Sequence, residues 1–186
     1  MNVEQPPEDL LAITLDAAAK DAQSTDPSGK ELATLPDGCW LKPSNILTDS
    51  RGSLFEMGSN RHWGDEPIVH VYGVTLRPGV VKGWALHKEH DDRYFIMSGD
   101  MEVVMYDVRP DASTYGRLFR VTLSDKSRAC LRIPAFVWHA DHNPGTEDVL
   151  LVNMPTKAYD HANPDKYRLP LDTDLIPHDF GDAKGW

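Results

Sequence analysis

Residues 80–109, VVKGWALHKEHDDRYFIMSGDMEVVMYDVR, hold the pattern that decides the fold. Ionisable and aromatic side chains crowd the first half of this stretch. A Ser98-Gly99-Asp100 turn then leads into strand-like alternation from Met101 to Val108. Side chains that alternate with a period of two are typical of a strand with one face buried. Polar groups placed just before a turn between two strands predict a β-barrel with a functional site inside it.

A second cluster of ionisable and aromatic residues lies further along the chain. Residues 133–143, IPAFVWHADHN, again place histidines and an acid at the end of an apolar run. We expect the two segments to face each other across one pocket, with His87 and His139 lining it.

The rest of the chain also predicts an all-β fold. Short strand-like runs separated by Gly, Pro, Asp and Asn are typical of an antiparallel sandwich or barrel, and they cover residues 53–57, 68–76, 118–123, 129–133 and 149–152. Early acids and a 3.6-residue apolar period predict a short helix over residues 8–20. We therefore expect an N-terminal extension over residues 1–37 and one β-domain over 38–186, which ends in an irregular C-terminal segment.

Composition narrows the classes of partner. The formal net charge is −10 and the pI is near 5.1, which argues against nucleic acid and membrane surfaces as partners. The two cysteines, Cys39 and Cys130, fit no metal spacing. The first residues lack the basic start and apolar run of a secretion signal, so a cytoplasmic location is expected.

Several motifs resemble those of the dTDP-4-dehydrorhamnose 3,5-epimerase family. Residues 49–56, DSRGSLFE, resemble its DxRGxLxE segment, and residues 79–84, GVVKGW, resemble GVxRGxH. Residues 106–116, YDVRPDASTYG, and residues 133–139, IPAFVWH, resemble two later motifs in the same order and spacing. The match extends over roughly residues 44–180.

The resemblance implies a cupin-type jelly-roll barrel, a homodimer and no cofactor. It also implies an isomerase that acts on a nucleotide-linked 4-keto-6-deoxy sugar by removing a proton next to the ketone. Such chemistry needs a base, donors for the enolate oxygen and an acid on the other face of the sugar.

The resemblance also assigns candidate roles. Read without gaps, Lys82 takes the family's basic position and Ala85 the position of its catalytic histidine; a shift of two residues gives that role to His87. A family tyrosine falls near Asn153, and the acid that pairs with the histidine falls near Asp172. His139, Asp172 and Lys82 complete the expected catalytic set. The expected substrate-binding residues are Arg51 and Glu56 for the nucleotide, Arg93 for the enolate, and Trp84 and Trp138 for stacking.

Two other classes stay open. Metal cupins hold a cation with histidines and a carboxylate, and His87, Asp92 and His139 fall at matching positions before Gly99 and Asn143. These three residues would form a site for a divalent metal such as Fe, with His90 or Glu89 as a further ligand. A catalytically silent sugar-binding cupin is the third class, because Ala85 and Asn153 lack the expected chemistry.

Overall fold

In the computed structural model, residues 9–20, 22–27, 32 and 34–185 are described, and the chain forms two compact units, 1–32 and 33–186. The first unit contains helix α1 (Leu10–Ala17), which begins after Asp9. The Asp9 carboxylate accepts the main-chain N–H of Ala12 at 3.2 Å, which satisfies one of the free donors of the first turn. The helix predicted over 8–20 is present, although Glu8 lies outside the described residues.

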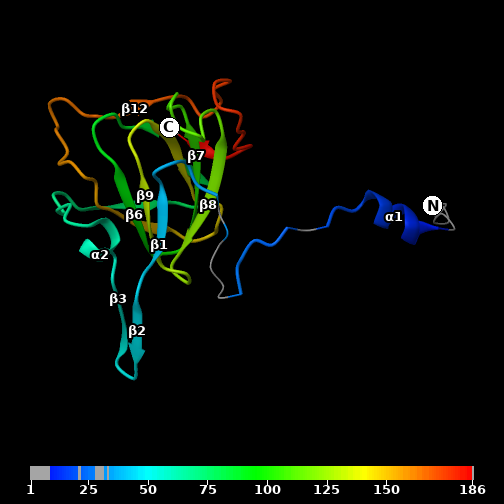
Figure 1. Ribbon diagram of the computed structural model, residues 1–186, viewed down its shortest axis with the longest axis horizontal. Coiled ribbons are helices and arrows are strands. Elements are labelled where there is room, and N and C mark those ends of the chain that lie inside the picture. The colour runs from blue at the N-terminus through cyan, green and yellow to red at the C-terminus, as the bar shows by residue number, and fades with distance from the viewer. Residues whose placement is uncertain (1–8, 21, 28–31, 33, 186) are drawn as a thin grey trace. The chain divides into compact units, whose positions relative to one another are not determined.

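In its described residues, 34–185, the second unit contains strands and one short helix, α2 (Asn60–Trp63). A five-stranded sheet has the order β1-β9-β6-β11-β4, and a second sheet has the order β12-β5-β10-β7-β8 with β13 beside β5. Figure 1 shows β1, β6 and β9 of the first sheet beside β7 and β8 of the second. Strands β2 and β3 form a separate hairpin. The strands are β1 (Trp40–Pro43), β2 (Ile46–Asp49), β3 (Gly52–Phe55), β4 (Tyr72–Leu76), β5 (Val80–Leu86), β6 (Asp92–Ser98), β7 (Asp100–Asp107), β8 (Leu118–Ser124), β9 (Ala129–Ile133), β10 (Val137–His142), β11 (Val149–Asn153), β12 (Tyr167–Arg168) and β13 (Lys184–Gly185). The predicted all-β jelly roll is therefore confirmed.

The main core lies between the two large sheets. It is built from inward-facing side chains of both sheets, among them Ile96 and Leu151 from one and Met105 and Val121 from the other. The strands that build this core contribute alternate residues, because successive side chains of a strand point to opposite faces. Leu35 packs against this core from the segment that precedes β1.

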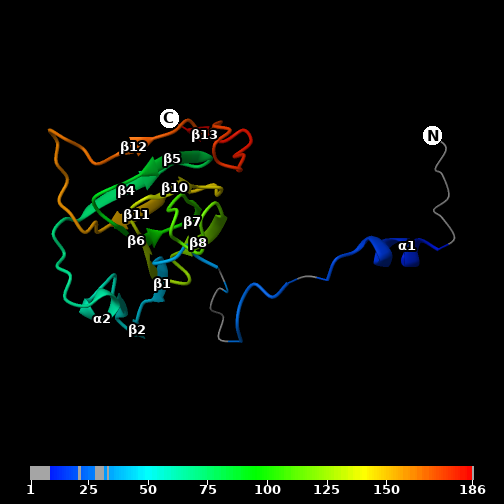
Figure 2. The ribbon, with the colours of Figure 1, turned by 45° about the horizontal axis from the view of Figure 1, so that its top comes forward.

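Both outer faces are also covered. Trp84, Val104 and Ala140 form a cluster on the outer face of the second sheet, where the C-terminal segment packs through Leu171 and Phe180. Figure 2 shows β12 and β13, two short strands of the C-terminal part of the chain, next to β5, with which both of them pair. On the outer face of the first sheet, a third cluster gathers around buried Trp63 of α2; its other buried members are Phe95, Cys130 and Met154.

A β-bulge between β5 and β10 sets which side chains face inward. Ala85 pairs with His139, and Lys82 pairs with Asp141. Between these two pairs β5 therefore contains one residue more than β10. Lys82 and Ala85 consequently share the inner face although three positions separate them. At Gly83 the close approach of β5 and β10 leaves no room for a side chain, since an added Cβ would lie 2.4 Å from the Cβ of Ala140.

The β2–β3 hairpin projects beyond the two sheets (Figure 1). Its apolar side chains are exposed, with Leu47 at 67% and Leu54 at 61%. Neither helix of the described chain has the length and apolar composition that crossing a bilayer requires.

Candidate active site

A pocket between the two large sheets gathers the ionisable residues of the opening stretch. It is lined by His70, Tyr72, Lys82, Ala85, His87, His90, Asp92, Tyr94, His139, Pro155, Lys157, Tyr159, Asp165 and Lys166. Strands β4, β5, β6 and β10 supply its walls, and the segment between β11 and β12 covers it. The two sequence clusters therefore face each other across one pocket, as predicted.

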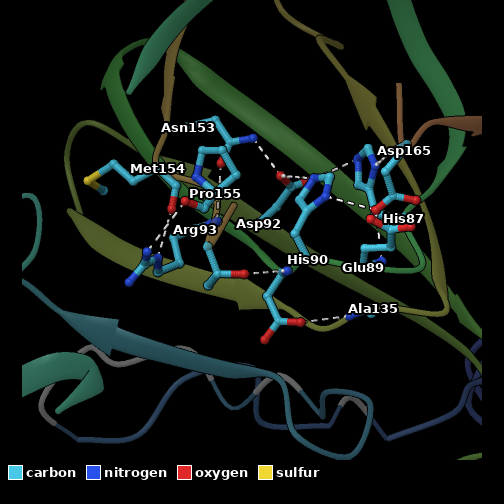
Figure 3. Close-up of polar contacts among 12 residues, drawn as sticks. His87, Glu89, His90, Asp92, Arg93, Ala135, Asn153, Met154, Pro155 and Asp165 are labelled. Atoms are coloured by element: carbon cyan, nitrogen blue, oxygen red, sulfur yellow. Dashed lines mark hydrogen bonds and ion pairs between the residues drawn. The ribbon is translucent and has the colours of Figure 1, made fainter. Parts of the chain in front are cut away.

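Asp92 lies at the centre of the pocket, almost fully buried. Its Oδ2 is 3.3 Å from Nε2 of His87 and 3.4 Å from Nε2 of His139. Its Oδ1 accepts the side-chain amide of Asn153 at 2.6 Å and lies 3.8 Å from Nε2 of His90. Figure 3 shows Asn153 on one side of Asp92 and His87 on the other.

His87, His90 and His139 are oriented alike, with Nδ1 turned away from Asp92 and Nε2 turned toward it. Nδ1 of His87 donates to the main-chain carbonyl of Asp165, and Nδ1 of His139 donates to that of Val137 at 3.2 Å. Nδ1 of His90 lies 2.9 Å from Oδ2 of Asp165. Oxygen acceptors on Nδ1 fix the proton there, so that each neutral ring turns an unprotonated Nε2 toward Asp92.

The buried charges shift the pKa values of these groups in different directions. Burial lowers the pKa of His87, but the hydrogen bond that the protonated ring donates to Asp92 and the charge attraction between the two groups outweigh burial, so the pKa is raised above 6.5. Burial lowers the pKa of His139 to about 3, so this ring stays neutral. Burial opposes the charge of Asp92, yet its hydrogen bond to His87 and the nearby imidazoles hold its pKa below the usual range. His87 is thus the pocket imidazole best suited to exchange a proton near neutrality.

On the side of the first sheet, hydrogen bonds connect Asp92 through Asn153 to Tyr72. Asn153 on β11 pairs with Tyr72 on β4, and its side-chain amide donates to the Tyr72 hydroxyl at 2.8 Å. Its amide oxygen accepts the main-chain N–H of Arg93 at 3.1 Å, which fixes the orientation of the amide. Burial raises the pKa of Tyr72 to about 12.

A third set of polar side chains in this region consists of Lys82, the buried carboxylate of Asp141 and Tyr94. Lys82 Nζ is 3.7 Å from Oδ2 of Asp141, and the hydroxyl of Tyr94 donates to the same oxygen at 3.4 Å. Burial raises the pKa of Asp141 to about 6, although Lys82 opposes the shift. Lys166 also lines the pocket, and burial lowers its pKa to about 8.

Three of the expected catalytic residues, Lys82, His87 and His139, lie together in this pocket with Asp92. Ala85 lies between them and offers only a methyl group. The fourth, Asp172, instead lines an open depression within the C-terminal segment, together with Leu171 and Phe180.

Three of the expected substrate-binding residues point to outer faces. Arg93 follows inward-facing Asp92, so its guanidinium leaves the pocket and donates to the carbonyl of Met154 at 2.7 Å (Figure 3). Trp84 and Trp138 belong to the cluster under the C-terminal segment, where Trp84 lies 5.4 Å from the ring of Phe180.

The other two expected substrate-binding residues lie on or next to the projecting hairpin. Arg51, at its turn, pairs with Asp49 at 2.5 Å. Glu56, directly after β3, accepts the side-chain amide of Asn45 at 3.1 Å. Neither belongs to the pocket lining, which is formed by residues between 70 and 166.

Sequence reasoning missed Tyr72, Asp165 and Lys166 as pocket residues. Asp165 and Lys166 lie in an irregular segment whose path no periodicity reveals. Asp141, the buried partner of Lys82, was also missed. The sequence did contain a signal for it, because Asp141 lies two positions after His139 and therefore on the same face of a strand.

Comparison with known proteins first shows which class of protein has this fold. The dTDP sugar isomerase of Desulfovibrio desulfuricans G20 superposes with a TM-score of 0.73 at 26% identity, over 82% of this chain and 98% of that one. The epimerase RmlC of Legionella pneumophila has the same fold, with a TM-score of 0.71 at 16% identity over 82% of this chain and 85% of its own. The predicted resemblance to cupin-type sugar epimerases is confirmed.

The particular family follows from the sequence. Residues 47–167 match the profile of the "Polysaccharide biosynthesis C-terminal domain" family. The "Probable low-salt glycan biosynthesis epimerase Agl13" of Haloferax volcanii is 36% identical over 144 residues, which are 75% of this chain and 91% of that protein. This chain belongs to the polysaccharide biosynthesis C-terminal domain family.

Proposed function

We propose that this protein is an isomerase of a nucleotide-linked 4-keto-6-deoxy sugar, and that His87 removes the proton next to the ketone. The observation that carries the proposal is the His87 imidazole, whose Nδ1 is held by the Asp165 carbonyl while Nε2 faces the pocket beside Asp92. The relatives named above, an epimerase and a dTDP sugar isomerase, agree with the predicted class of enzyme.

The base is organised to hold the proton that it takes. Nε2 of His87 accepts the proton, and the electron pair of the C–H bond becomes the enolate double bond while charge moves to the ketone oxygen. The Asp92 carboxylate, 3.3 Å from Nε2, stabilises the imidazolium that forms. His139 lies 3.4 Å from the same oxygen and, being neutral, adds no competing charge.

Lys82 is the proposed partner of the enolate oxygen. Its ammonium lines the pocket on β5, on the same inner face as Ala85. A cation beside a developing oxyanion is more effective in a buried site than in water. In this mechanism the residues of the chain carry the reaction without a cofactor.

The nucleotide would be bound across a dimer. The hairpin displays Leu47 and Leu54 to solvent, and the same hairpin region carries Arg51 and Glu56 away from the pocket. In a homodimer these apolar side chains would be covered, and Arg51 and Glu56 of one subunit would reach the pocket of the other. Apolar area of this kind is typical of a subunit interface.

We expect light scattering after size exclusion to give twice the mass of the chain. Leu47→Asp should give a folded monomer, because it places a charge in the apolar contact. An exposed control, Ser53→Asp on the same hairpin, tests charge alone. A monomeric wild-type protein would contradict the dimer.

The reaction is tested by isotope exchange. The protein is incubated with dTDP-4-keto-6-deoxyglucose in D₂O, and deuterium at C3 and C5 is followed by NMR. We expect incorporation next to the ketone that depends on the enzyme. A protein that leaves both positions protonated would rule out enolate chemistry on this class of sugar.

A specific observation favours a second candidate, a metal-dependent cupin enzyme. Ligand atoms of His87, His90 and Asp92 lie within 4.8 Å of one another, and Nε2 of His139 is 3.4 Å from Asp92. Each of the three rings donates Nδ1–H outward, the arrangement that orients histidines toward a metal. These nitrogen and oxygen donors fit a divalent ion such as Fe; when bound, it would supply Lewis acidity. Glu89 instead pairs with Lys157.

Metal content separates the two candidates. Elemental analysis of protein purified without chelator should show substoichiometric Fe, Mn, Ni and Zn if the first candidate is right, and EDTA should leave the melting temperature unchanged. Near-stoichiometric metal, with a melting temperature that falls on chelation, would favour the second. His90→Ala should abolish such binding without removing His87.

We propose a cytoplasmic location for this protein. Cys39 and Cys130 are both free thiols, which is compatible with the reducing cytoplasm.

A further inference from the structure

We propose that Tyr72 is the acid that returns a proton to the sugar from the face opposite His87. This inference rests on the proposed function. It adds the second proton carrier, which allows the enzyme to invert the configuration of the carbon and not only to exchange its proton. Inversion needs a second proton carrier, because a base that both removes and returns the proton restores the original configuration.

The pocket places Tyr72 on the side of Asp92 away from His87. His87 contacts Oδ2 of Asp92 at 3.3 Å, whereas Asn153, which holds Tyr72, contacts Oδ1 at 2.6 Å. Figure 3 shows Asn153 and His87 on opposite sides of Asp92. Tyr72 lies on β4 in the first sheet and His87 follows β5 in the second, so a sugar held between the sheets would have one group on each face.

The hydrogen bond from Asn153 leaves the phenol proton free to be donated. The Asn153 amide donates to the Tyr72 oxygen at 2.8 Å, and the main-chain N–H of Arg93 fixes this orientation from the other end of the amide. The Tyr72 oxygen therefore acts as an acceptor toward Asn153 and can direct its own O–H into the pocket. The amide of Asn153 cannot itself release a proton, but it stabilises the phenolate after transfer.

The other phenols of the pocket are less suitable. Tyr94 is buried, and its O–H points at the Asp141 carboxylate at 3.4 Å, so that its proton is already engaged. Tyr159 lies in the covering segment, with its ring 4.8 Å from His161 and 46% of its surface exposed. Burial keeps the pKa of Tyr72 near 12, and the phenol stays protonated at neutral pH.

Water restores the starting protonation states of Tyr72 and His87 after each turnover. The enolate carbon takes the Tyr72 proton as the ketone re-forms, and the phenolate of Tyr72 is then reprotonated by water. His87, which holds the proton from the other face, releases it to water. The substrate gains and loses one proton in each cycle, and no oxidant or reductant is needed.

The test separates exchange from inversion in Tyr72→Phe. Wild-type protein and variant are incubated in D₂O with dTDP-4-keto-6-deoxyglucose; deuterium at C3 and C5 is measured, and inversion is measured after borohydride reduction and separation of the epimers. We expect the variant to exchange close to the wild-type rate while inversion falls by roughly a hundredfold or more. Circular dichroism confirms that the variant is folded.

Two further variants and the wild type make the outcome decisive. Tyr115→Phe, an exposed tyrosine of the β7–β8 connection, should match the wild type in both measurements. Normal inversion by Tyr72→Phe, or exchange without inversion by Tyr159→Phe instead, would overturn the inference while leaving the proposed function intact. No exchange by the wild-type protein would remove the proposed function and this inference together.

Discussion

His87→Asn should lower the rate of deuterium exchange next to the ketone by roughly 10²- to 10⁴-fold, the usual contribution of a general base. Asparagine keeps a polar side chain of moderate size but cannot accept the proton. The protein should stay folded, because His87 lies at the edge of the pocket and is partly exposed. A variant that exchanges deuterium at the wild-type rate would show that another group is the base.

A histidine on the opposite face of a neighbouring strand gives a matched control. His142 is on β10, three residues after His139, and its ring lies 5.9 Å from Phe180 under the C-terminal segment. His142→Asn should leave exchange unchanged. Loss of activity in both variants would indicate a general effect of replacing histidine in this fold.

The pH dependence gives a second readout of the same role. Only neutral His87 can accept a proton, so kcat/KM should rise with pH through the pKa of this imidazole. That pKa is raised above 6.5 because the hydrogen bond and charge of Asp92 outweigh burial, and the rising limb should therefore lie above pH 6.5. In Asp92→Asn the raising interaction is lost, so the limb of the residual activity should move to lower pH. A limb that stays in place would assign the titration to another group.

Much of the fold and half of the site can be predicted from the sequence because both depend on local patterns. Strands with a period of two and the motif order give the jelly roll, and the two polar clusters give His87, Asp92 and His139. The same period also separates neighbours: inward Asp92 implies outward Arg93, and inward His139 implies outward Trp138. The substrate roles expected for Arg93 and Trp138 follow from what an enolate and a sugar ring require of their partners, and they overlook this alternation.

The remaining site residues depend on features that no local pattern contains. The bulge in β5 turns Lys82 and Ala85 to the same face, and strict alternation would have separated them. Tyr72 enters the pocket through its register with Asn153, eighty-one positions away in the chain. Asp165 is brought to His87 by an irregular segment, so its contact depends on tertiary packing.

Arg93 illustrates how an expected ligand residue becomes a structural one. Its guanidinium is fully buried and donates to the carbonyls of Met154 at 2.7 Å and Pro67 at 3.2 Å. The same group lies 4.4 Å from the ring centroid of Trp63. It thus ties β6 to α2 and to the chain that leaves β11 just after Asn153.

Arg93→Met should lower the free energy of unfolding by about 3–5 kcal/mol, since methionine fills the space but leaves buried carbonyls without donors. The melting temperature should fall by roughly 10 °C. Arg51→Met is the matched control: its side chain is 88% exposed, and its solvent-screened pair with Asp49 should contribute little to stability. Denaturant unfolding measures both. If Arg93→Met kept its stability but lost sugar-nucleotide binding, Arg93 would have to face the substrate. The alternation of β6 argues against that orientation, because it commits Asp92 to the pocket and the next residue to the opposite face.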